Sequence, residues 1–476
     1  MQSNSMSKEC LELLGNKKRK YYSAILLCCS IIFYLFFAFY DGVVILADSP
    51  SYIDMYTSRE PFYCVFLAAL RGLFGLFGLG EYNTSYLTAA VCIQSLLAAF
   101  AALCLADYLQ KEFCLSRFQS GVVFFIPLAT SLLCRFAAQR ASMYSNSILT
   151  EGIACSLFLI FMRYVLEFCY KQGVKCLVIS SILSFILIST RKQMYLTLIL
   201  LVIVILWTYG IDKKIKKGIF TVLICTCCIL FSNILFDGVY NYFAHGELGT
   251  HANDNRFLAT MVIYTSERTY GENIADENAR DLFYEIYDIC DAKGYLKHSA
   301  ERGWYNRVDH FGDHYDHIQI DTMWPAIERY VRENYTGGEV FLEKKVDEIT
   351  NHMIWGLLPT TWGKVLGCFM DNFLSGLVTT VAQRRPILII YSLVIYILYF
   401  VLLITHIKHK GMTKVAYLAI VTMFAIVINV AVVSMVIFCQ TRYTIYNMPV
   451  FYITLWILFI KSKAHFMKQI YWKTEP

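Results

Sequence analysis

The chain has 476 residues, of which 57% are hydrophobic and 16% charged, and its mean hydropathy is +0.49. Soluble domains are usually about 45–50% apolar and about 25% charged, so this composition excludes a disordered chain, a cytosolic enzyme and a disulfide-built secreted domain. The net charge of +6 hides two opposite parts, since residues 237–385 carry 14 Lys and Arg against 23 Asp and Glu, and the remainder carries 28 against 13. A basic, hydrophobic body with one acidic insert is typical of a membrane protein with a soluble loop on one side.

Ten apolar stretches predict membrane-spanning helices. A bilayer core is about 30 Å thick and needs about 20 apolar residues of helix. The stretches cover residues 21–40, 84–106, 119–135, 148–168, 175–190, 194–210, 218–236, 386–405, 414–438 and 443–460. We therefore predict an all-α polytopic membrane protein with an N-terminal membrane module (1–236), an extracytoplasmic domain (237–385) and C-terminal membrane helices (386–476).

Amphipathic helices are expected outside the spans. In the first outer loop, residues 41–83, the apolar stretch 61–79 contains Arg71 and several glycines, which favours an interfacial helix over another span. In the insert, residues 276–293 and 323–334 are expected to form helices with charged outer faces. Residues 353–381 are apolar and include Trp355 and Trp362, so we expect them to lie against the membrane surface.

Orientation follows from the distribution of Lys and Arg. Basic clusters lie in alternate connections, among them residues 17–20, 213–217 and 408–414. The positive-inside rule therefore predicts a multi-pass protein of the cell membrane with both termini in the cytoplasm and the insert outside. The first span follows a basic segment and lacks a small-residue cleavage site, so we expect an uncleaved anchor.

The first outer loop contains the sharpest local signal, with Asp48 and Tyr52 followed by Arg59 and Glu60. Charged groups at a membrane interface have a desolvation cost, so they are usually paired or functional. An acid and a base on one short loop are suited to removing a proton from a hydroxyl group and holding an anion. The alternative is that Asp48 only caps the helix that begins at the following Ser-Pro-Ser.

Three further signals lie at the outer ends of other spans. Glu151 begins the fourth span, Arg191 and Lys192 form the turn after the fifth, and Arg442 with Tyr443 precedes the last. The cations are on the side that the positive-inside rule disfavours, and phosphate is a natural partner for them. The alternatives are a helix-dipole contact for Glu151, a simple turn or a lipid headgroup contact for Arg191 and Lys192, and a structural ion pair for Arg442.

A histidine-rich segment of the insert contains His310, His314 and His317 among four aspartates. The spacing of the first two would place two imidazoles on one helix face, as in some metal sites. Gly312 and the neighbouring acids favour a solvated polar loop instead. The sequence therefore predicts no metal ligands and no definite cofactor, although a divalent metal stays open.

The order and sidedness of these signals resemble the GT-C superfamily of integral-membrane glycosyltransferases, in particular the protein mannosyltransferases and aminoarabinose transferases. The resemblance covers roughly the whole membrane body. It is carried by the acid-x-x-x-Tyr motif from Asp48 to Tyr52, the Pro-aromatic helix after Arg59-Glu60, Thr150-Glu151, Arg191, and Arg442-Tyr443 with Pro449.

The chain also departs from the family pattern. Asp48 is followed by Ser49 where many relatives have a second acid, which puts the use of a divalent metal in doubt. Arg191 is followed by Lys192 rather than the frequent proline. The outer domain lies between the seventh and eighth spans rather than at the C-terminus, which leaves the acceptor open.

The resemblance implies an inverting transfer of a sugar from a polyprenyl-phosphate carrier to a hydroxyl group of a glycan, lipid or protein on the extracytoplasmic face. Asp48 is then the expected base, and Arg191, Lys192 and Arg442 are expected to hold the phosphate. The expected partners are the donor, the acceptor and the bilayer, with no nucleic acid. Two alternatives stay open, a polysaccharide polymerase and a flippase or transporter of lipid-linked oligosaccharides.

Overall fold

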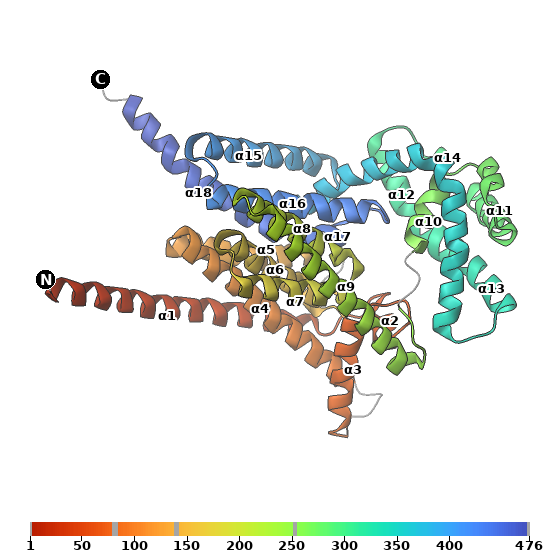
Figure 1. Ribbon diagram of the computed structural model, residues 1–476, viewed down its shortest axis with the longest axis horizontal. Helices are drawn as coiled ribbons and strands as arrows, with labels where there is room; N and C mark the ends of the chain where they lie inside the picture. The colour runs from red at the N-terminus through yellow and green to blue at the C-terminus, as the bar shows by residue number, and fades with distance from the viewer. Residues whose placement is uncertain (1, 79–83, 138–141, 251–254, 474–476) are drawn as a thin grey trace.

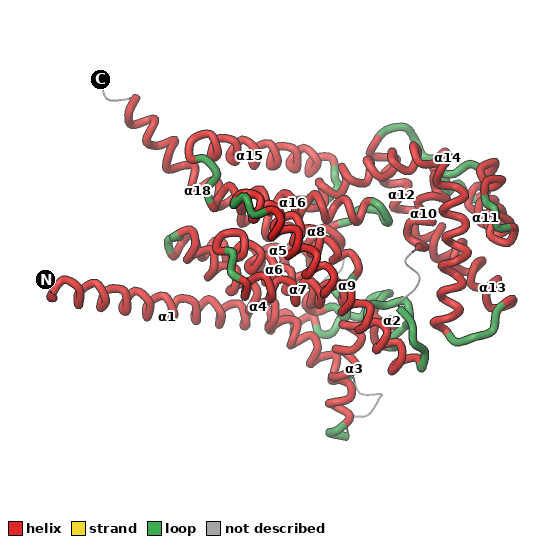
Figure 2. Tube along the Cα trace, viewed as in Figure 1, coloured by secondary structure: helices red, strands yellow, loops and turns green. Residues whose placement is uncertain are grey.

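The computed structural model describes residues 2–78, 84–137, 142–250 and 255–473, with side chains between residues 20 and 462 of these ranges except at 136 and 137. The basic side chains at 17–19, which contributed to the predicted orientation, lie outside the described side chains. The structure is 84% helical and contains no strand in the described ranges (Figure 2). The prediction of an all-α polytopic membrane protein is therefore confirmed.

All ten predicted spans coincide with helices. These are α1 (Gln2–Asp41), α4 (Ser85–Phe113), α5 (Arg117–Ala137), α6 (Glu151–Lys171), α7 (Val174–Thr190), α8 (Tyr195–Ile211), α9 (Ile215–His245), α15 (Pro386–Lys410), α16 (Lys414–Ser434) and α18 (Met448–Lys473). Nine segments of the described chain are long and apolar enough to cross a membrane, and α7, with 17 residues, is the shorter tenth. Nine of the ten predicted spans are therefore supported by length and composition, whereas α7 is a shorter apolar helix whose role as a span stays a prediction.

The helices of the membrane body differ strongly in how deeply they are buried. In α6 and in the segment Thr441–Ser462, which includes the start of α18, 67% and 72% of the most apolar window is buried. The corresponding share for α9 is 6%, so α9 presents nearly all of its apolar surface outward. The helices α6 and α18 are therefore surrounded by other helices of the membrane body.

The first outer loop folds back onto the chain segment that leads into α6. It contains α2 (Ser49–Ile53) and α3 (Pro61–Gly75), and it contacts the short helical turn η1 (Tyr144–Asn146). The backbone N–H of Val44 donates to the carbonyl of Asn146, and the N–H of Ile148 donates to the carbonyl of Val44, both at 3.0 Å. These two bonds fix the loop beside the first turn of α6.

The insert forms a helical domain with its own hydrophobic core. Its helices are α10 (Asn255–Thr265), α11 (Glu277–Ala292), α12 (Trp304–Ile318), α13 (Trp324–Asn334) and α14 (Glu339–Val381), with short turns at Arg268–Asn273, Lys297–Ser299 and Gln319–Met323. Both predicted amphipathic helices are present, as α11 and α13. Figure 1 shows this outer domain on one side, beyond the ends of the spans, and α14 runs back to the membrane body.

The predicted loop around the histidines is wrong, because these residues lie in α12. Gly312 is an interior residue of this helix, and a Cβ at this position would meet the ring of Phe438 at 3.4 Å, an ordinary van der Waals distance. Phe311 and Tyr315 on the same helix are buried in the core of the outer domain. Tertiary packing therefore outweighs the weak helix propensity of glycine and aspartate here.

Candidate functional site

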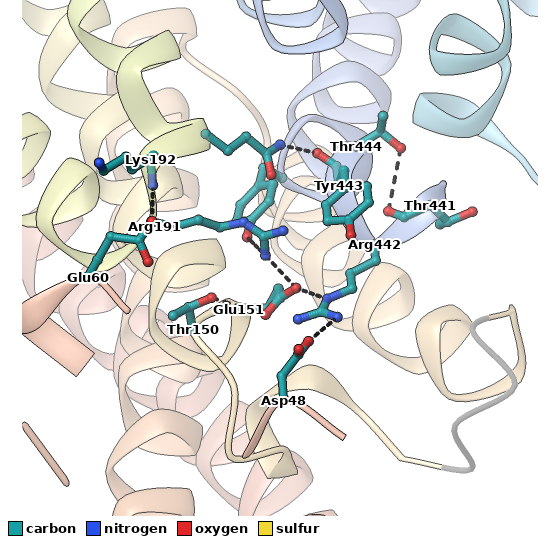
Figure 3. Close-up of polar contacts among 12 residues, drawn as sticks. Asp48, Glu60, Thr150, Glu151, Arg191, Lys192, Thr441, Arg442, Tyr443 and Thr444 are labelled. Atoms are coloured by element: carbon teal, nitrogen blue, oxygen red, sulfur yellow. Dashed lines mark hydrogen bonds and ion pairs between the residues drawn. The ribbon is translucent and has the colours of Figure 1, made fainter. Parts of the chain in front are cut away.

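Two arginines from distant parts of the chain converge on the buried carboxylate of Glu151 (Figure 3). Glu151 is the first residue of α6, and its side chain is fully buried. Its Oε1 accepts a hydrogen bond from Nη1 of Arg191 at 2.6 Å and forms an ion pair with Nε of Arg442. Arg442 belongs to the short helix α17 (Thr441–Thr444), which precedes the turn Ile445–Asn447 and then α18.

Asp48 joins this cluster by binding a second nitrogen of the Arg442 guanidinium group. Its Oδ2 accepts from Nη1 of Arg442 at 2.7 Å, and its Oδ1 accepts from Nη2 of Arg59 at 3.0 Å. The side chain makes no hydrogen bond to the backbone of α2, so the helix-capping alternative is wrong. Asp48 is 34% exposed whereas Glu151 is not exposed at all, so Asp48 is the carboxylate that reaches solvent.

The arginines keep Asp48 ionised. Partial burial raises the pKa of this carboxyl, but the guanidinium groups of Arg442 and Arg59 outweigh burial and hold the pKa below its usual value. Three guanidinium groups and two carboxylates meet here, so the cluster of Asp48, Arg59, Glu151, Arg191 and Arg442 has a formal charge of +1. Such a cluster is suited to receiving an anionic group.

Two tyrosine rings pack against guanidinium groups of the cluster. The guanidinium carbon of Arg59 lies 4.6 Å from the ring centre of Tyr52, and that of Arg191 lies 4.9 Å from the ring centre of Tyr443. Nη1 of Arg59 also donates to the hydroxyl of Tyr52 at 3.2 Å. Burial raises the pKa of Tyr52 to about 12, so its hydroxyl stays neutral. These contacts hold the arginines by both packing and charge.

Glu60 and Lys192 lie to one side of the cluster. Oε1 of Glu60 accepts from the backbone N–H of Lys192 at 2.9 Å, which fixes the turn η2 (Lys192–Met194) beside the first outer loop. Figure 3 shows the Lys192 side chain pointing away from Arg191 and Glu151. Of the nine predicted site residues, seven come together and these two brace the turn that carries Arg191.

The sequence analysis missed a pair of amides behind the cluster. Nε2 of Gln193 donates to Oδ1 of Asn429 at 2.7 Å and also to the carbonyl of Tyr443. Nδ2 of Asn429 donates to the same carbonyl at 3.0 Å. The pair thus ties the turn after Arg191 to the residue after Arg442. A buried asparagine inside an otherwise apolar span is a signal that could have identified it.

Gln94 in α4 fixes the other side of the site and was also missed. Its Nε2 donates to the carbonyls of Ser145 and Ser147 at 2.9 and 3.2 Å, and its Oε1 accepts from the hydroxyl of Tyr63 at 2.8 Å. Gly152, the residue after Glu151, lies directly against the amide of Gln94. Its signal was the same, a polar side chain within an apolar stretch.

A small cavity of about 50 Å³ lies beside Glu151, among residues of α1, α4, α5 and α6. It is lined by Glu151, Gly152, Tyr144 and Tyr446, and it holds at most a few water molecules. The side of the cluster open to solvent is the one on which Asp48 is exposed. Among the described residues, no group of three or more His, Cys, Asp and Glu side chains is placed to hold a metal ion.

Comparison of the chain with protein-family models and with curated proteins gives no match. The function is therefore argued from the geometry and chemistry of this cluster.

Proposed function

We propose that the protein is a membrane glycosyltransferase of the GT-C type that uses a polyprenyl-phosphate-linked sugar. The observation that carries the proposal is the convergence of Arg191 and Arg442 on the buried Glu151, directly beside the partly exposed carboxylate of Asp48. A base and an anion site are the two groups that a sugar transfer from a lipid phosphate requires.

In the proposed reaction, Asp48 accepts the proton of the acceptor hydroxyl as its oxygen attacks the anomeric carbon. The bond between that carbon and the phosphate oxygen breaks, and its electron pair leaves with the lipid phosphate. The anomeric carbon passes through an oxocarbenium-like state and is inverted by the single displacement. Atoms and charge balance, because the proton goes to Asp48 and the negative charge to the phosphate.

Arg442 and Arg191 are proposed to stabilise the negative charge that develops on the leaving phosphate. Glu151 does not touch the substrate in this proposal, because it is fully buried behind both guanidinium groups. Its role is to hold them in place before the donor arrives, so that little reorganisation is needed during the reaction. Arg59 holds Asp48 in the same way from the opposite side.

The site is proposed to face the extracytoplasmic side, with both termini in the cytoplasm. The basic connections between the spans lie at the opposite ends of the helices from Asp48, Glu151 and Arg442, which supports this orientation. The donor and the acceptor then meet outside the membrane, where a lipid-linked sugar presents its headgroup.

Transfer of label from polyprenyl-phosphate sugars by membranes containing the protein tests the proposal. We expect Asp48→Asn to lower the transfer rate at least 100-fold, which is the contribution of a positioned general base. Asp54→Asn is the matched control, because this exposed carboxylate lies in the same loop but outside the cluster. Full transfer by Asp48→Asn would remove Asp48 from the mechanism.

The product of the reaction distinguishes the proposed transferase from a polymerase and from a flippase. A single added sugar supports the proposed transferase, whereas a ladder of repeat units identifies a polymerase. Movement of intact lipid-linked sugar across the membrane, with no new glycosidic bond, identifies a flippase.

A further inference from the structure

The loop that leads to Arg442 is anchored in the outer domain. This loop, residues 435–440, connects the end of α16 to α17. The carbonyl of Val436 accepts a hydrogen bond from the hydroxyl of Tyr315 in α12 at 2.9 Å. The ring of Phe438 lies 5.4 Å from the ring of Tyr315, and Ile437 and Phe438 both pack against the hydrophobic core of the outer domain.

A second contact holds the same loop from α14, the last helix of the insert. A Cβ at Gly376 would stand 2.9 Å from Sγ of Cys439 and 2.5 Å from Cγ1 of Val430, so only glycine permits this approach. The hydroxyl of Thr444 donates to the hydroxyl of Thr379 at 3.3 Å. The segment 435–444 is therefore enclosed by α12 and α14 on one side and by α16 on the other.

The helix α12 also lies close to the charged cluster itself. Asp309 in α12 forms an ion pair with Arg384, which follows the end of α14. Asp316, the residue after Tyr315, has its pKa raised first by burial and then by the negative charge of Asp48. Asp316 of α12 therefore lies near enough to Asp48 for the two charges to interact.

We infer that the outer domain positions Arg442, with Tyr315 and Phe438 as the positioning residues. The guanidinium of Arg442 contacts both Asp48 and Glu151, so the position of its backbone has to suit two contacts at once. A shift of the loop by a fraction of an ångström changes both contacts. The outer domain is thus part of the catalytic geometry and not an independent module. This inference rests on the proposed function for its activity measurement but not for its structural one.

The structural measurement is hydrogen exchange of the backbone of residues 435–444 in the full-length protein in detergent. Tyr315→Phe removes the hydroxyl, which bonds the carbonyl of Val436 and also contacts the carbonyl of Phe257 at 3.4 Å and Nε2 of Gln319 at 3.3 Å. We expect exchange in residues 435–444 to become about two- to tenfold faster, as for loss of the bond to Val436, the one of the three that reaches this segment. The matched control is Tyr264→Phe, which removes a hydroxyl bonded to Nδ1 of His310 inside the same domain. Exchange at 435–444 is expected to be unchanged in that variant.

The activity measurement separates positioning from general destabilisation. Tyr315→Phe is expected to lower kcat for sugar transfer about two- to tenfold with little change in the KM of the acceptor, because Arg442 acts on the developing charge. In an Arg442→Lys background the same substitution is expected to have no further effect. In an Arg191→Lys background its effect is expected to persist in full.

The outcomes distinguish the positioning role of the outer domain from the proposed glycosyltransferase function. Unchanged exchange at 435–444 in both Tyr315→Phe and Phe438→Leu overturns the positioning role, whatever the activity. A full effect of Tyr315→Phe in the Arg442→Lys background overturns it as well. Faster exchange in a protein that transfers no sugar supports the anchoring of the loop and contradicts the proposed function.

Discussion

Glu151 and Arg442 form an ion pair although they are 291 positions apart in the sequence. The pair joins the first turn of α6 to the helix that precedes α18, the two most buried parts of the membrane body. Because Glu151 also binds Arg191, one buried carboxylate fixes three separate chain segments. The pair is therefore a structural link of the membrane body as well as the centre of the proposed site.

Glu151→Gln is expected to destabilise the protein strongly. The substitution removes the carboxylate that Arg191 and Arg442 share and leaves Arg442 with Asp48 alone, and breaking such a buried pair costs about 3 kcal/mol or more. Thermal unfolding of the purified protein in detergent measures the effect. The control is Glu167→Gln on the same helix, where Glu167 pairs with Arg163 at 3.5 Å and with the exposed Lys171 at 3.1 Å.

The control substitution Glu167→Gln is expected to change the free energy of unfolding by less than about 1 kcal/mol, since partly exposed ion pairs contribute little to stability. Equal shifts of the melting temperature in Glu151→Gln and Glu167→Gln would show that burial of Glu151 does not add to the energy of its ion pairs.

Asp48 is expected to make stability depend on pH only in the acid range. Its pKa in the folded protein is below the ordinary value of about 3.9, so its ionised form stabilises the fold above that value. This contribution is lost as the pH falls through the lower, folded pKa. The difference in melting temperature between the wild type and Asp48→Asn is therefore expected to be constant from pH 5 to 8 and to shrink below about pH 4. A difference that grows towards acid pH has the wrong sign for a lowered pKa.

Arg191 and Lys192 are expected to differ greatly in importance although they are neighbours. Arg191→Lys replaces the fork that contacts Glu151 with a single charged point, and we expect transfer to fall about 100-fold. Lys192→Gln keeps the backbone N–H that Glu60 binds, so we expect a change of no more than about threefold. Initial rates at several donor concentrations measure both. An equally large loss in Lys192→Gln would show that its side chain reaches the phosphate when the donor binds.

The predicted orientation is open to a direct test with epitope tags in two exposed turns. One tag is placed between Thr336 and Gly337 of the outer domain, and the other between Gly411 and Met412, in the connection from α15 to α16. An impermeant antibody is expected to bind the first tag on intact cells and the second only after permeabilisation. The reverse pattern would contradict both the orientation and the proposed location of the site.

The spans could be predicted because about 20 consecutive apolar residues are long enough to cross a bilayer as a helix. The helices α11 and α13 could be predicted because their apolar residues recur with the period of an α-helix. The sequence also placed the charges of the cluster at the ends of separate spans, on the side that it predicts to be extracytoplasmic. It could not predict which charges pair, because Asp48 and Arg442 are 394 positions apart and meet only through the tertiary packing of the helices. The histidine segment shows the same limit, since α12 is held by the burial of Phe311 and Tyr315 against residues that are distant in the sequence.

Gly152→Ala is expected to disturb the site without altering any charge. A Cβ at Gly152 would stand 2.6 Å from Cδ of Gln94, whose amide is buried and bonded to the chain segment before α6. Moving Gln94 breaks those bonds, so we expect a loss of about 1–3 kcal/mol and a fall in transfer. Gly72→Ala in α3 is the control, because no atom lies within 4 Å of its added Cβ and alanine favours the helix by about 1 kcal/mol. Melting temperatures of the two variants measure the difference, and a Gly152→Ala protein as stable as Gly72→Ala would show that Gln94 adjusts freely.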